Sequence, residues 1–386
     1  MRRLISRLLK GSSRSAHLRL TRWISTFIAA WFSLQLLQSK ESDAYIDRVP
    51  PNTYSSTGVA PKTVRFAGRT MDLTLFALTR ALDVIVGELW SRRKARRMAT
   101  NKWSQVESIV SGSTDSAIFA SSCALIMWSW IYAPSRLPRA YNKWITSAAQ
   151  VDQRLLTALR RTRYGEIKYG LETGQAHVLQ SMCKDYGWPL DYGDPVKSIP
   201  FPCELVHMGT GKNCEYHALL RWLRSFKWAF LTYLPLNMAL TLRRPSRKAF
   251  LAALQSSIRS SSFLGTFIAL YYYGICLART RIGPKVLGKS TVACQQIDSG
   301  ICIASGCAIC GWSIMLENES RRKDIGLFVA PRALATLVPR RYPWDQQWRE
   351  TMVFAMSTAV VFTCVAEQPK RVRGVLGKVL ARVLNG

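Results

Sequence analysis

Four residues in the middle of the chain have the types and the close spacing of a metal site. They are Cys203, His207, Cys214 and His217. Two thiolates and two imidazoles can bind zinc tetrahedrally. Their order differs from that of standard zinc fingers, in which the paired cysteines come first and the paired histidines follow. Two other interpretations stay open: a disulfide between Cys203 and Cys214 in an oxidising compartment, or neither role.

A second set of side chains is charged and occurs in two similar stretches. Residues 72–82 and 324–334 both follow the pattern Asp-(Leu/Ile)-x-Leu-Phe-x-x-x-Arg-Ala-Leu. The acid, the phenylalanine and the arginine are spaced by four residues, so they share one face of a helix. The charged members are Asp72, Arg80, Asp324 and Arg332. They predict either a polar relay or substrate contact between two repeats, or ion pairs that hold helices together.

Motifs of common enzymes are missing from the sequence. The segment Gly209-x-Gly211-Lys212 lacks the spacing of a phosphate-binding loop, and neither G-x-S-x-G nor H-E-x-x-H occurs. We therefore expect that the protein is not an enzyme, that it has no catalytic residues, and that it needs no cofactor unless the Cys/His residues bind zinc.

The composition excludes several classes of protein. The 386 residues are 48% hydrophobic and include 13 Trp, 14 Tyr and 14 Phe, which a disordered chain would not contain. Ten cysteines are too sparse for a small disulfide-rich scaffold. The net charge is +31, but the basic residues border apolar blocks rather than forming one stripe. Membrane lipids with anionic headgroups are therefore the expected partners, and nucleic acid is not.

The apolar residues form blocks long enough to suggest a membrane protein, and the mean hydropathy of +0.01 averages these blocks with basic loops. A bilayer crossing needs about 20 mostly apolar residues. Six charge-free runs approach this length: Trp23–Ser39, Ser116–Ser135, Trp228–Leu242, Ser260–Ala278, Ser299–Leu316 and Thr351–Ala366. Two more segments, Met71–Trp90 and Asp324–Val338, carry charges. Each is either an interfacial helix or a span whose charges face other helices.

The basic residues predict how these segments cross the membrane. Four acid-free basic runs are Met1–Arg22, Arg92–Lys102, Arg243–Arg259 and Lys370–Arg382. Eight spans place all four on one side, as the positive-inside rule requires, although Arg279–Lys289 then falls on the other side. We expect an all-α polytopic integral membrane protein with six to eight transmembrane or interfacial helices. We favour eight, with both termini on the cytosolic side.

The two charged stretches indicate an internal duplication. Each half of the chain reads as a span, a charged helix and a span, which predicts two inverted three-helix repeats. The predicted organisation is a basic N-terminal segment (1–22), a first repeat (23–135), a polar Cys/His-containing segment (136–227), two connecting spans (228–278), a second repeat (299–366) and a basic tail (367–386).

Small residues recur near the start of the second repeat. Gly300, Ala304 and Ala308 are spaced by four, and Gly311 falls close to the same face. Small residues at this spacing let helix backbones approach closely in lipid. The pattern predicts a face for tight packing within the chain or for contact with a second copy.

Two stretches resemble a known family. Residues 317–324 (ENESRRKD) followed by 327–334 (LFVAPRAL) look like a conserved stretch of the transmembrane protein 135 family, and 202–207 (PCELVH) with Cys214 resembles that family's cysteine-rich region. The resemblance covers roughly residues 60–380, with gaps. The C-terminal part is also distantly similar to the Tim17/Tim22/Tim23 and peroxisomal membrane protein superfamily.

This resemblance implies a role in peroxisomal or mitochondrial membranes, in lipid handling or organelle dynamics. We therefore expect a protein that supports lipid or metabolite movement at the peroxisomal membrane, with the mitochondrial membrane as the alternative. The other expectation is a structural or translocase-like scaffold that binds other organelle-membrane proteins or a second copy of itself. The Arg-rich, acid-free segment Met1–Arg22 is typical of mitochondrial presequences and equally of basic flanks that orient a first span.

Overall fold

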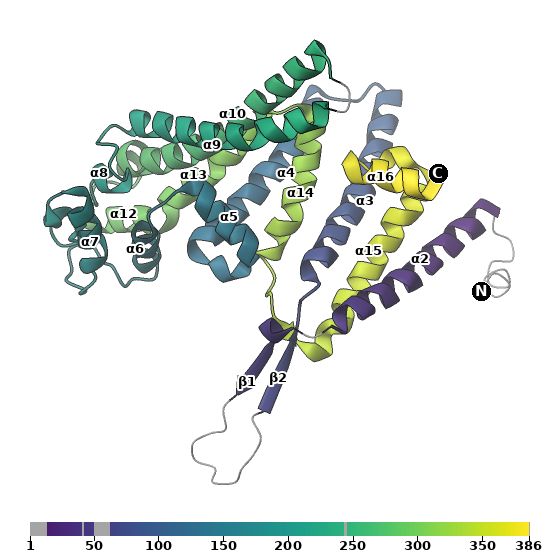
Figure 1. Ribbon diagram of the computed structural model, residues 1–386, viewed down its shortest axis with the longest axis horizontal. Coiled ribbons are helices and arrows are strands. Elements are labelled where there is room, and N and C mark those ends of the chain that lie inside the picture. Colours follow the sequence, from purple (N-terminus) through teal and green to yellow (C-terminus); the bar gives the residue numbers. More distant parts are fainter. Residues whose placement is uncertain (1–13, 41, 50–61, 243–244, 386) are drawn as a thin grey trace, which may run out of the picture. The chain divides into compact units, whose positions relative to one another are not determined.

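The computed structural model describes residues 14–40, 42–49, 62–242 and 245–385. Residues 1–13 of the predicted basic segment, and the first two residues of the basic run that begins at Arg243, lie outside the described residues. The described chain is mostly helical (Figure 1). It forms two compact units, residues 1–113 with 323–386 and residues 114–322. The unit boundaries fall inside helices α4 (Gln105–Tyr132) and α14 (Glu319–Ala335), so the chain divides differently from the predicted repeats.

The first unit is built around helix α15. Its elements are α2 (Arg14–Gln38), β1 (Ile46–Val49), β2 (Lys62–Ala67), α3 (Met71–Ala99), most of α14, β3 (Tyr342–Pro343), α15 (Gln347–Glu367) and α16 (Gly374–Asn385). Helix α15 packs against α2 and α3. A small apolar core joins α3, α15 and the start of the C-terminal segment, where Val84, Val365 and Val372 are buried together. Burial of these valines holds three segments that are far apart in the sequence.

The three strands correct the expectation of an all-α fold. β1 and β2 pair antiparallel, with Ile46 opposite Arg65, and β3 pairs with the end of β2, where Ala67 lies opposite Tyr342. The pairing places the segments before α3 and before α15 side by side, because consecutive strands of a sheet lie about 5 Å apart. The strand pair β1–β2 is visible in Figure 1.

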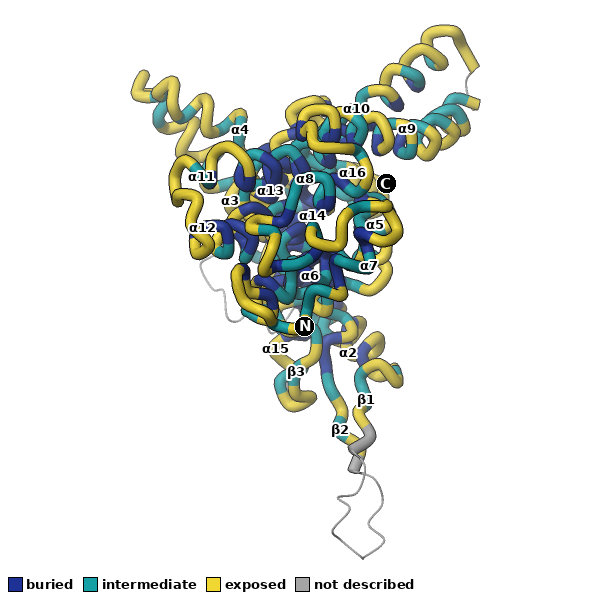
Figure 2. Tube along the Cα trace, turned by 90° about the vertical axis from the view of Figure 1, so that its left-hand side faces the viewer, coloured by how far each residue is buried: buried dark blue, intermediate teal, exposed yellow. Residues whose placement is uncertain are grey.

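The second unit contains the polar segment and the helices around it. Its elements are most of α4, α5 (Arg139–Ala149), α6 (Gln153–Arg163), α7 (His177–Tyr186), α8 (Cys203–Val206), α9 (Cys214–Thr241), α10 (Arg247–Leu277), a π-turn (Ala278–Ile282), α11 (Gly283–Val286), α12 (Thr291–Gln296), a second π-turn (Ile297–Ile301), α13 (Cys302–Cys310) and a 3-10 turn (Gly311–Leu316). Helix α10 packs along α9 and against α13. The helices of both units have buried and exposed faces (Figure 2).

The polar segment has its own apolar core. Buried residues from α6, α7, α8 and the loops between them form one cluster, which includes Leu155, Ile167, Met182 and Leu205. Local sequence signals begin several of these helices. Asp152 accepts a hydrogen bond from the Arg154 amide at the start of α6, and Ser and Asn residues cap α9, α10 and α12 in the same way. The segment is therefore a folded, packed element.

Within the described residues, four helical segments are long and apolar enough to cross a membrane. They are Gln105–Tyr132, Arg247–Val286, Thr291–Leu316 and Trp344–Glu367. Four of the six predicted charge-free runs lie in these segments. The runs Trp23–Ser39 and Trp228–Leu242 largely coincide with parts of α2 and α9, and the two charged segments overlap α3 and α14. These helices are not among the four. The structure therefore supports a membrane protein, with four strongly apolar helices among the described residues against the six charge-free runs of the prediction.

Candidate functional site

Three of the four predicted Cys/His residues meet in the second unit. The ligand atoms of Cys203, His207 and Cys214 all lie within 4.8 Å of one another. Cys203 begins α8, His207 directly follows it, and Cys214 begins α9 after its cap residue Asn213, whose side chain accepts from the Tyr216 amide at 2.9 Å. The short helix and the capped helix start therefore bring the three groups together.

A third cysteine, which the sequence pattern missed, lies next to His207 of this group. Cys276 lies near the end of α10, and its Sγ is 3.2 Å from Nε2 of His207. Cys214 Sγ lies within 4.8 Å of Cys203 Sγ, and Cys214 also neighbours Cys276. Cys276 is 69 residues away from His207 along the chain, so no local spacing signals it. We call these four residues, Cys203, His207, Cys214 and Cys276, the Cys/His cluster.

The fourth predicted residue, His217, packs beside the cluster. Its ring stacks on His207 with centroids 4.4 Å apart, and Nδ1 lies 2.6 Å from Oγ1 of Thr210. Burial lowers the pKa of both imidazoles, that of His217 to about 3, and burial raises the pKa of the Cys203 thiol to about 11. Both rings are therefore neutral at physiological pH. The ten cysteines are all free in this structure.

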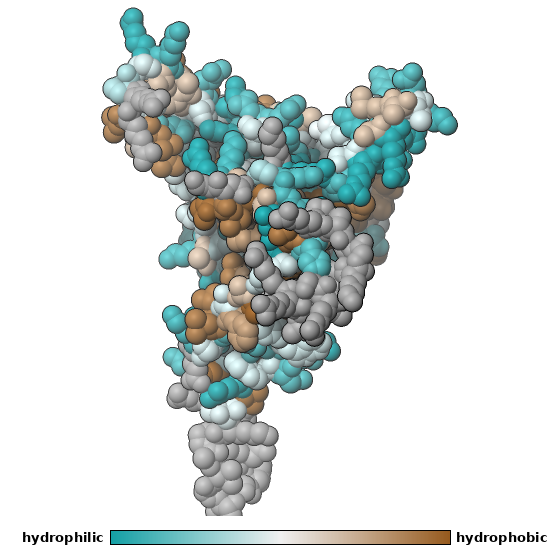
Figure 3. Space-filling view, turned by 90° about the vertical axis from the view of Figure 1, so that its right-hand side faces the viewer, coloured by the Kyte–Doolittle hydropathy of each residue, from teal (hydrophilic) through white to brown (hydrophobic). Residues whose placement is uncertain are grey.

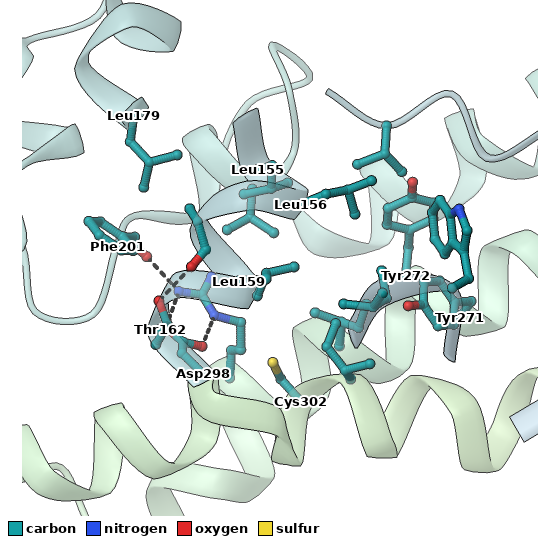
Figure 4. A pocket seen from close by; sticks show the side chains of 18 residues that line it. Leu155, Leu156, Leu159, Thr162, Leu179, Phe201, Tyr271, Tyr272, Asp298 and Cys302 are labelled. Carbon is teal, nitrogen blue, oxygen red and sulfur yellow. Dashed lines mark hydrogen bonds and ion pairs between the residues drawn. The ribbon is translucent and has the colours of Figure 1, made fainter. Parts of the chain in front are cut away.

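A buried ion pair lies in the same unit and was not predicted. Arg279 donates to Asp298 at 2.6 and 2.9 Å, and the Tyr169 hydroxyl donates to the same carboxylate at 2.5 Å. Arg279 also donates to the carbonyl of Phe201 at 3.0 Å (Figure 4). The two charged residues stand on the two π-turns, and both side chains are 6% exposed. Single-turn π-bulges inside helices are frequent at functional sites.

The ion pair borders a small apolar cavity of about 50 Å³. Leu155, Tyr271, Tyr272 and Cys302 are among the side chains that surround it (Figure 4). A cavity of this size holds a few water molecules at most, since one water needs roughly 10–15 Å³. The sequence carried a signal for the pair, because Arg279 and Asp298 directly adjoin the predicted charge-free runs Ser260–Ala278 and Ser299–Leu316.

The charged residues of the duplicated motif have separate partners in the first unit. Asp72 pairs with Arg340 at 2.9 Å, and Arg332 lies over the ring of Phe328 at 3.8 Å. Arg80 is buried and lies over Phe76, four residues before it, as Arg332 does over Phe328. The charged residues of one stretch therefore do not pair with each other.

One contact does bring the two stretches together. A Cβ at Gly374, where α16 begins, would meet both Asp324 Oδ1 and Arg80 Nη1, at 2.2 and 3.6 Å. Asp324 accepts from the Val375 amide at 3.0 Å, and Arg80 donates to the carbonyl of Arg373 at 3.3 Å. The acid of the second stretch and the arginine of the first thus anchor the start of the C-terminal helix.

Replacing Asp324 with alanine should loosen α16. The carboxylate accepts from an otherwise unpaired amide in the first turn, and loss of such a cap costs about 1 kcal/mol. In limited proteolysis, we expect trypsin to cleave Asp324→Ala at Lys378 roughly five times faster than it cleaves the wild type. Asp324→Asn keeps an acceptor oxygen and should show a smaller increase. Equal cleavage rates in the wild type and Asp324→Ala would mean that this contact does not hold the helix.

The four small residues of the predicted face do not share one environment. Gly300 and Gly311 are buried, but Ala304 and Ala308 are exposed. The π-turn at Ile297–Ile301, where Gly300 has a φ of +153°, changes the helical phase, so a spacing of four no longer keeps one face. Two glycines of this region make close backbone contacts. A Cβ at Gly311 would meet the Cα of Ala120 on α4, and a Cβ at Gly306 would lie 2.6 Å from the carbonyl oxygen of Tyr271 on α10.

The first unit also contains an open groove between α2, α3 and α15. Its volume is about 600 Å³. Apolar side chains that line it include Leu20, Trp23, Val84, Val360 and Cys364, and the guanidinium groups that line it are Arg19, Arg92 and Arg371. Figure 3 views the molecule from the side of α2 and α15 and shows hydrophobic and hydrophilic side chains close together on this face. We call this feature the α2–α15 groove.

The arginines of the α2–α15 groove are paired with glutamates. Arg19 pairs with Glu367 at 2.8 Å, and both Arg92 and Arg371 pair with Glu88. Three guanidinium groups against two carboxylates leave one positive charge in excess. The groove thus combines an apolar lining with a cationic edge. Comparisons of the chain with protein-family models, curated proteins and solved structures found no match.

Proposed function

We propose that this chain is a non-enzymatic membrane protein that binds anionic single-chain lipids such as fatty acids and supports their movement at an organelle membrane. The observation that carries this proposal is the α2–α15 groove. Its volume of about 600 Å³ is within the range of small-molecule sites, roughly 300–1,000 Å³. The cavity beside the Arg279–Asp298 pair is too small for such a cargo.

The chemistry of the groove favours an amphiphile with a negative headgroup. An acyl chain would cover the side chains of Leu20, Trp23 and Val360, and burial of apolar surface stabilises the complex by roughly 25 cal/mol per Å². The side chains of Arg19 and Arg92 are 63% and 67% exposed. Ion pairs at such exposed positions are weak. A ligand carboxylate can therefore compete with the glutamates for these guanidinium groups.

The membrane setting of the proposal extends beyond the four strongly apolar helices. We propose that α2, α3, α9 and α14 also cross or lie in the membrane, as eight segments with inverted repeats require. The distribution of basic runs supports this topology. The peroxisomal membrane is the proposed location and rests on the resemblance of residues 317–334 to the transmembrane protein 135 family. The mitochondrial membrane is the alternative.

Loss of the cationic edge should weaken the binding of fatty acids. In the double variant Arg19→Gln/Arg92→Gln, we expect the Kd of a fluorescent fatty acid for the detergent-purified protein to rise about tenfold, which corresponds to about 1.4 kcal/mol. The Kd of the uncharged methyl ester should not change. Arg349→Gln is a matched control, because Arg349 is an exposed arginine of α15 that is not part of the groove lining.

A second variant distinguishes the contribution of the arginine charges from that of the groove volume. Cys364 is half-buried in the groove, so Cys364→Trp should fill the groove and weaken the binding of the acid and of the ester alike. Transfer of the same fatty acid between liposomes containing the protein should fall in both variants. Wild-type affinity in Cys364→Trp, or equal losses for acid and ester in the arginine variant, would contradict the proposal.

Location and topology need a direct experiment. A fluorescent tag imaged with peroxisomal and mitochondrial markers identifies the membrane. Protease protection of the loop around Cys203 in the isolated organelle shows which side the polar segment faces. The proposal expects peroxisomal signal and protection of this loop, since eight spans with cytosolic termini place residues 136–227 on the far side.

A scaffold role is the second candidate function. The observation that favours it is the exposed face of α13, where Ala304 and Ala308 leave a shallow surface on a strongly apolar helix. Small exposed residues on membrane helices allow close contact with another helix. Crosslinking from A308C should then capture a second polypeptide in the native membrane. Crosslinks to helices of the same chain alone would remove this candidate.

A further inference from the structure

Four groups with lone pairs suited to a soft metal ion converge in the second unit. The Cys/His cluster takes its ligands from three places: α8 and the residue after it, the first turn of α9, and the end of α10. Cys203, His207 and Cys214 lie within 4.8 Å of one another through their ligand atoms. Cys276 Sγ lies 3.2 Å from Nε2 of His207, and Cys276 neighbours Cys214. The contacts thus link all four side chains.

The hydrogen bonds of His207 determine which ring nitrogen is free to bind a metal ion. Nδ1 lies 2.7 Å from the carbonyl oxygen of Gly211. A carbonyl can only accept, so Nδ1 carries the proton and Nε2 has a free lone pair. Nε2 is the atom that faces Cys276 at 3.2 Å. A metal-bound histidine almost always donates its other ring N–H to a carbonyl or carboxylate in this way.

The spacing suits zinc. Zinc binds imidazole nitrogen at about 2.0–2.1 Å and thiolate sulfur at about 2.3 Å in a tetrahedron, which places neighbouring N and S ligands roughly 3.5 Å apart. The observed 3.2 Å between His207 and Cys276 needs only a small adjustment. Zinc with three thiolates and one imidazole carries a net charge of −1. Arg221, which donates to the carbonyl oxygens of Ala149 and Gln150 rather than to an acid, would offset it.

We propose that Cys203, His207, Cys214 and Cys276 bind one zinc ion in a Cys₃His site that fastens the polar segment to α10. Each thiol loses its proton to solvent when its sulfur–zinc bond forms, and no oxidation is involved. We assign His217 as a packing partner of His207, because its ring stacks on that of His207 and its ligand atoms are not grouped with those of Cys203, His207 and Cys214. Among the residues that the structure describes, Nε2 of His217 is buried without a hydrogen-bond partner, so the His217 variant below is a direct test of this assignment. The site joins the start of α9 to the end of α10 and therefore closes one end of this helix pair.

The test measures metal in the full chain purified in detergent under reducing conditions. We expect about one zinc ion per chain in the wild type by elemental analysis, and a small fraction of this in Cys276→Ser and Cys203→Ser. Two matched controls should keep full zinc: His217→Phe, which preserves the stacked ring, and Cys183→Ser, which alters another buried cysteine of the polar segment.

Two further measurements test the proposal even if the serine variants fail to fold. Exchange of zinc for Co²⁺ in the wild type should give the absorption of tetrahedral cobalt with three thiolates, and Cys276→His should keep one metal ion with weaker thiolate absorption. Removal of zinc by a chelator should increase proteolysis between Cys203 and Cys214 several-fold, and added Zn²⁺ but not Mg²⁺ should reverse it. Wild-type protein without zinc, full zinc in Cys276→Ser, zinc loss in His217→Phe, or an isolated Cys203–Cys214 disulfide would each overturn the proposal.

Discussion

Replacement of Asp298 by leucine is expected to lower the free energy of unfolding of the second unit by about 3–5 kcal/mol. Arg279 and Asp298 are 6% exposed, and Arg279 has two hydrogen bonds to this carboxylate. Removing the acid leaves a buried guanidinium whose remaining partner is the Phe201 carbonyl. The midpoint of thermal unfolding, followed by tryptophan fluorescence in detergent, should fall by roughly 10 °C.

The double variant Arg279→Met/Asp298→Leu tests whether the two side chains stabilise the protein as a coupled pair. Replacing both members of a buried pair with apolar residues of similar volume is often close to neutral. We therefore expect the double variant to recover most of the stability lost in Asp298→Leu. If the double variant is as unstable as the sum of the two single variants, the side chains are not coupled, and the observed pairing is wrong. Asp298→Asn, which keeps an acceptor oxygen, should be intermediate.

The second large effect is expected at Gly306. Its Cβ would lie 2.6 Å from the carbonyl oxygen of Tyr271, and a Cβ at Gly274 would lie 2.9 Å from the Cα of Gly306. The backbones of α10 and α13 are thus in direct contact at these two glycines. Gly306→Leu forces the helices apart and should cost about 3 kcal/mol, the upper part of the range for overpacking. We expect gel filtration to show less monodisperse protein and thermal unfolding to show a lower midpoint than in the wild type.

Ala304→Leu is the matched control for this prediction. Ala304 lies on the same helix, half a turn from Gly306, but it is exposed. The same side chain added there should change stability by no more than about 0.5 kcal/mol. If Ala304→Leu is as damaging as Gly306→Leu, then the face predicted from the spacing of Gly300, Ala304 and Ala308 packs after all, and the contact at Gly306 does not decide the packing.

The proposed lipid site and the proposed zinc site can be tested independently. The α2–α15 groove belongs to the first unit and the Cys/His cluster to the second. Zinc loss in Cys276→Ser should leave fatty-acid affinity unchanged, and Cys364→Trp should keep its zinc. A failure of one proposal therefore does not carry over to the other.

The sequence by itself determined the features that depend on neighbouring residues. Apolar runs bounded by basic residues indicated helices that suit a membrane, and four of the six runs lie in helices that are long and apolar enough to cross it. The association of Cys203, His207 and Cys214 was also predictable, because a short helix and one capped helix start bring them together. The small strands were missed, since all three are short and β3 pairs with a strand far away in the sequence.

Only the tertiary structure decided the partners that distant segments supply. Cys276 replaces His217 in the cluster because α10 packs along α9, a contact that no local pattern encodes. Arg279 finds Asp298 for the same reason, across two π-turns that periodicity does not reveal. The helical period assigns residues to faces only while the helix stays regular. One π-turn near Gly300 was enough to move Ala304 and Ala308 to the exposed side.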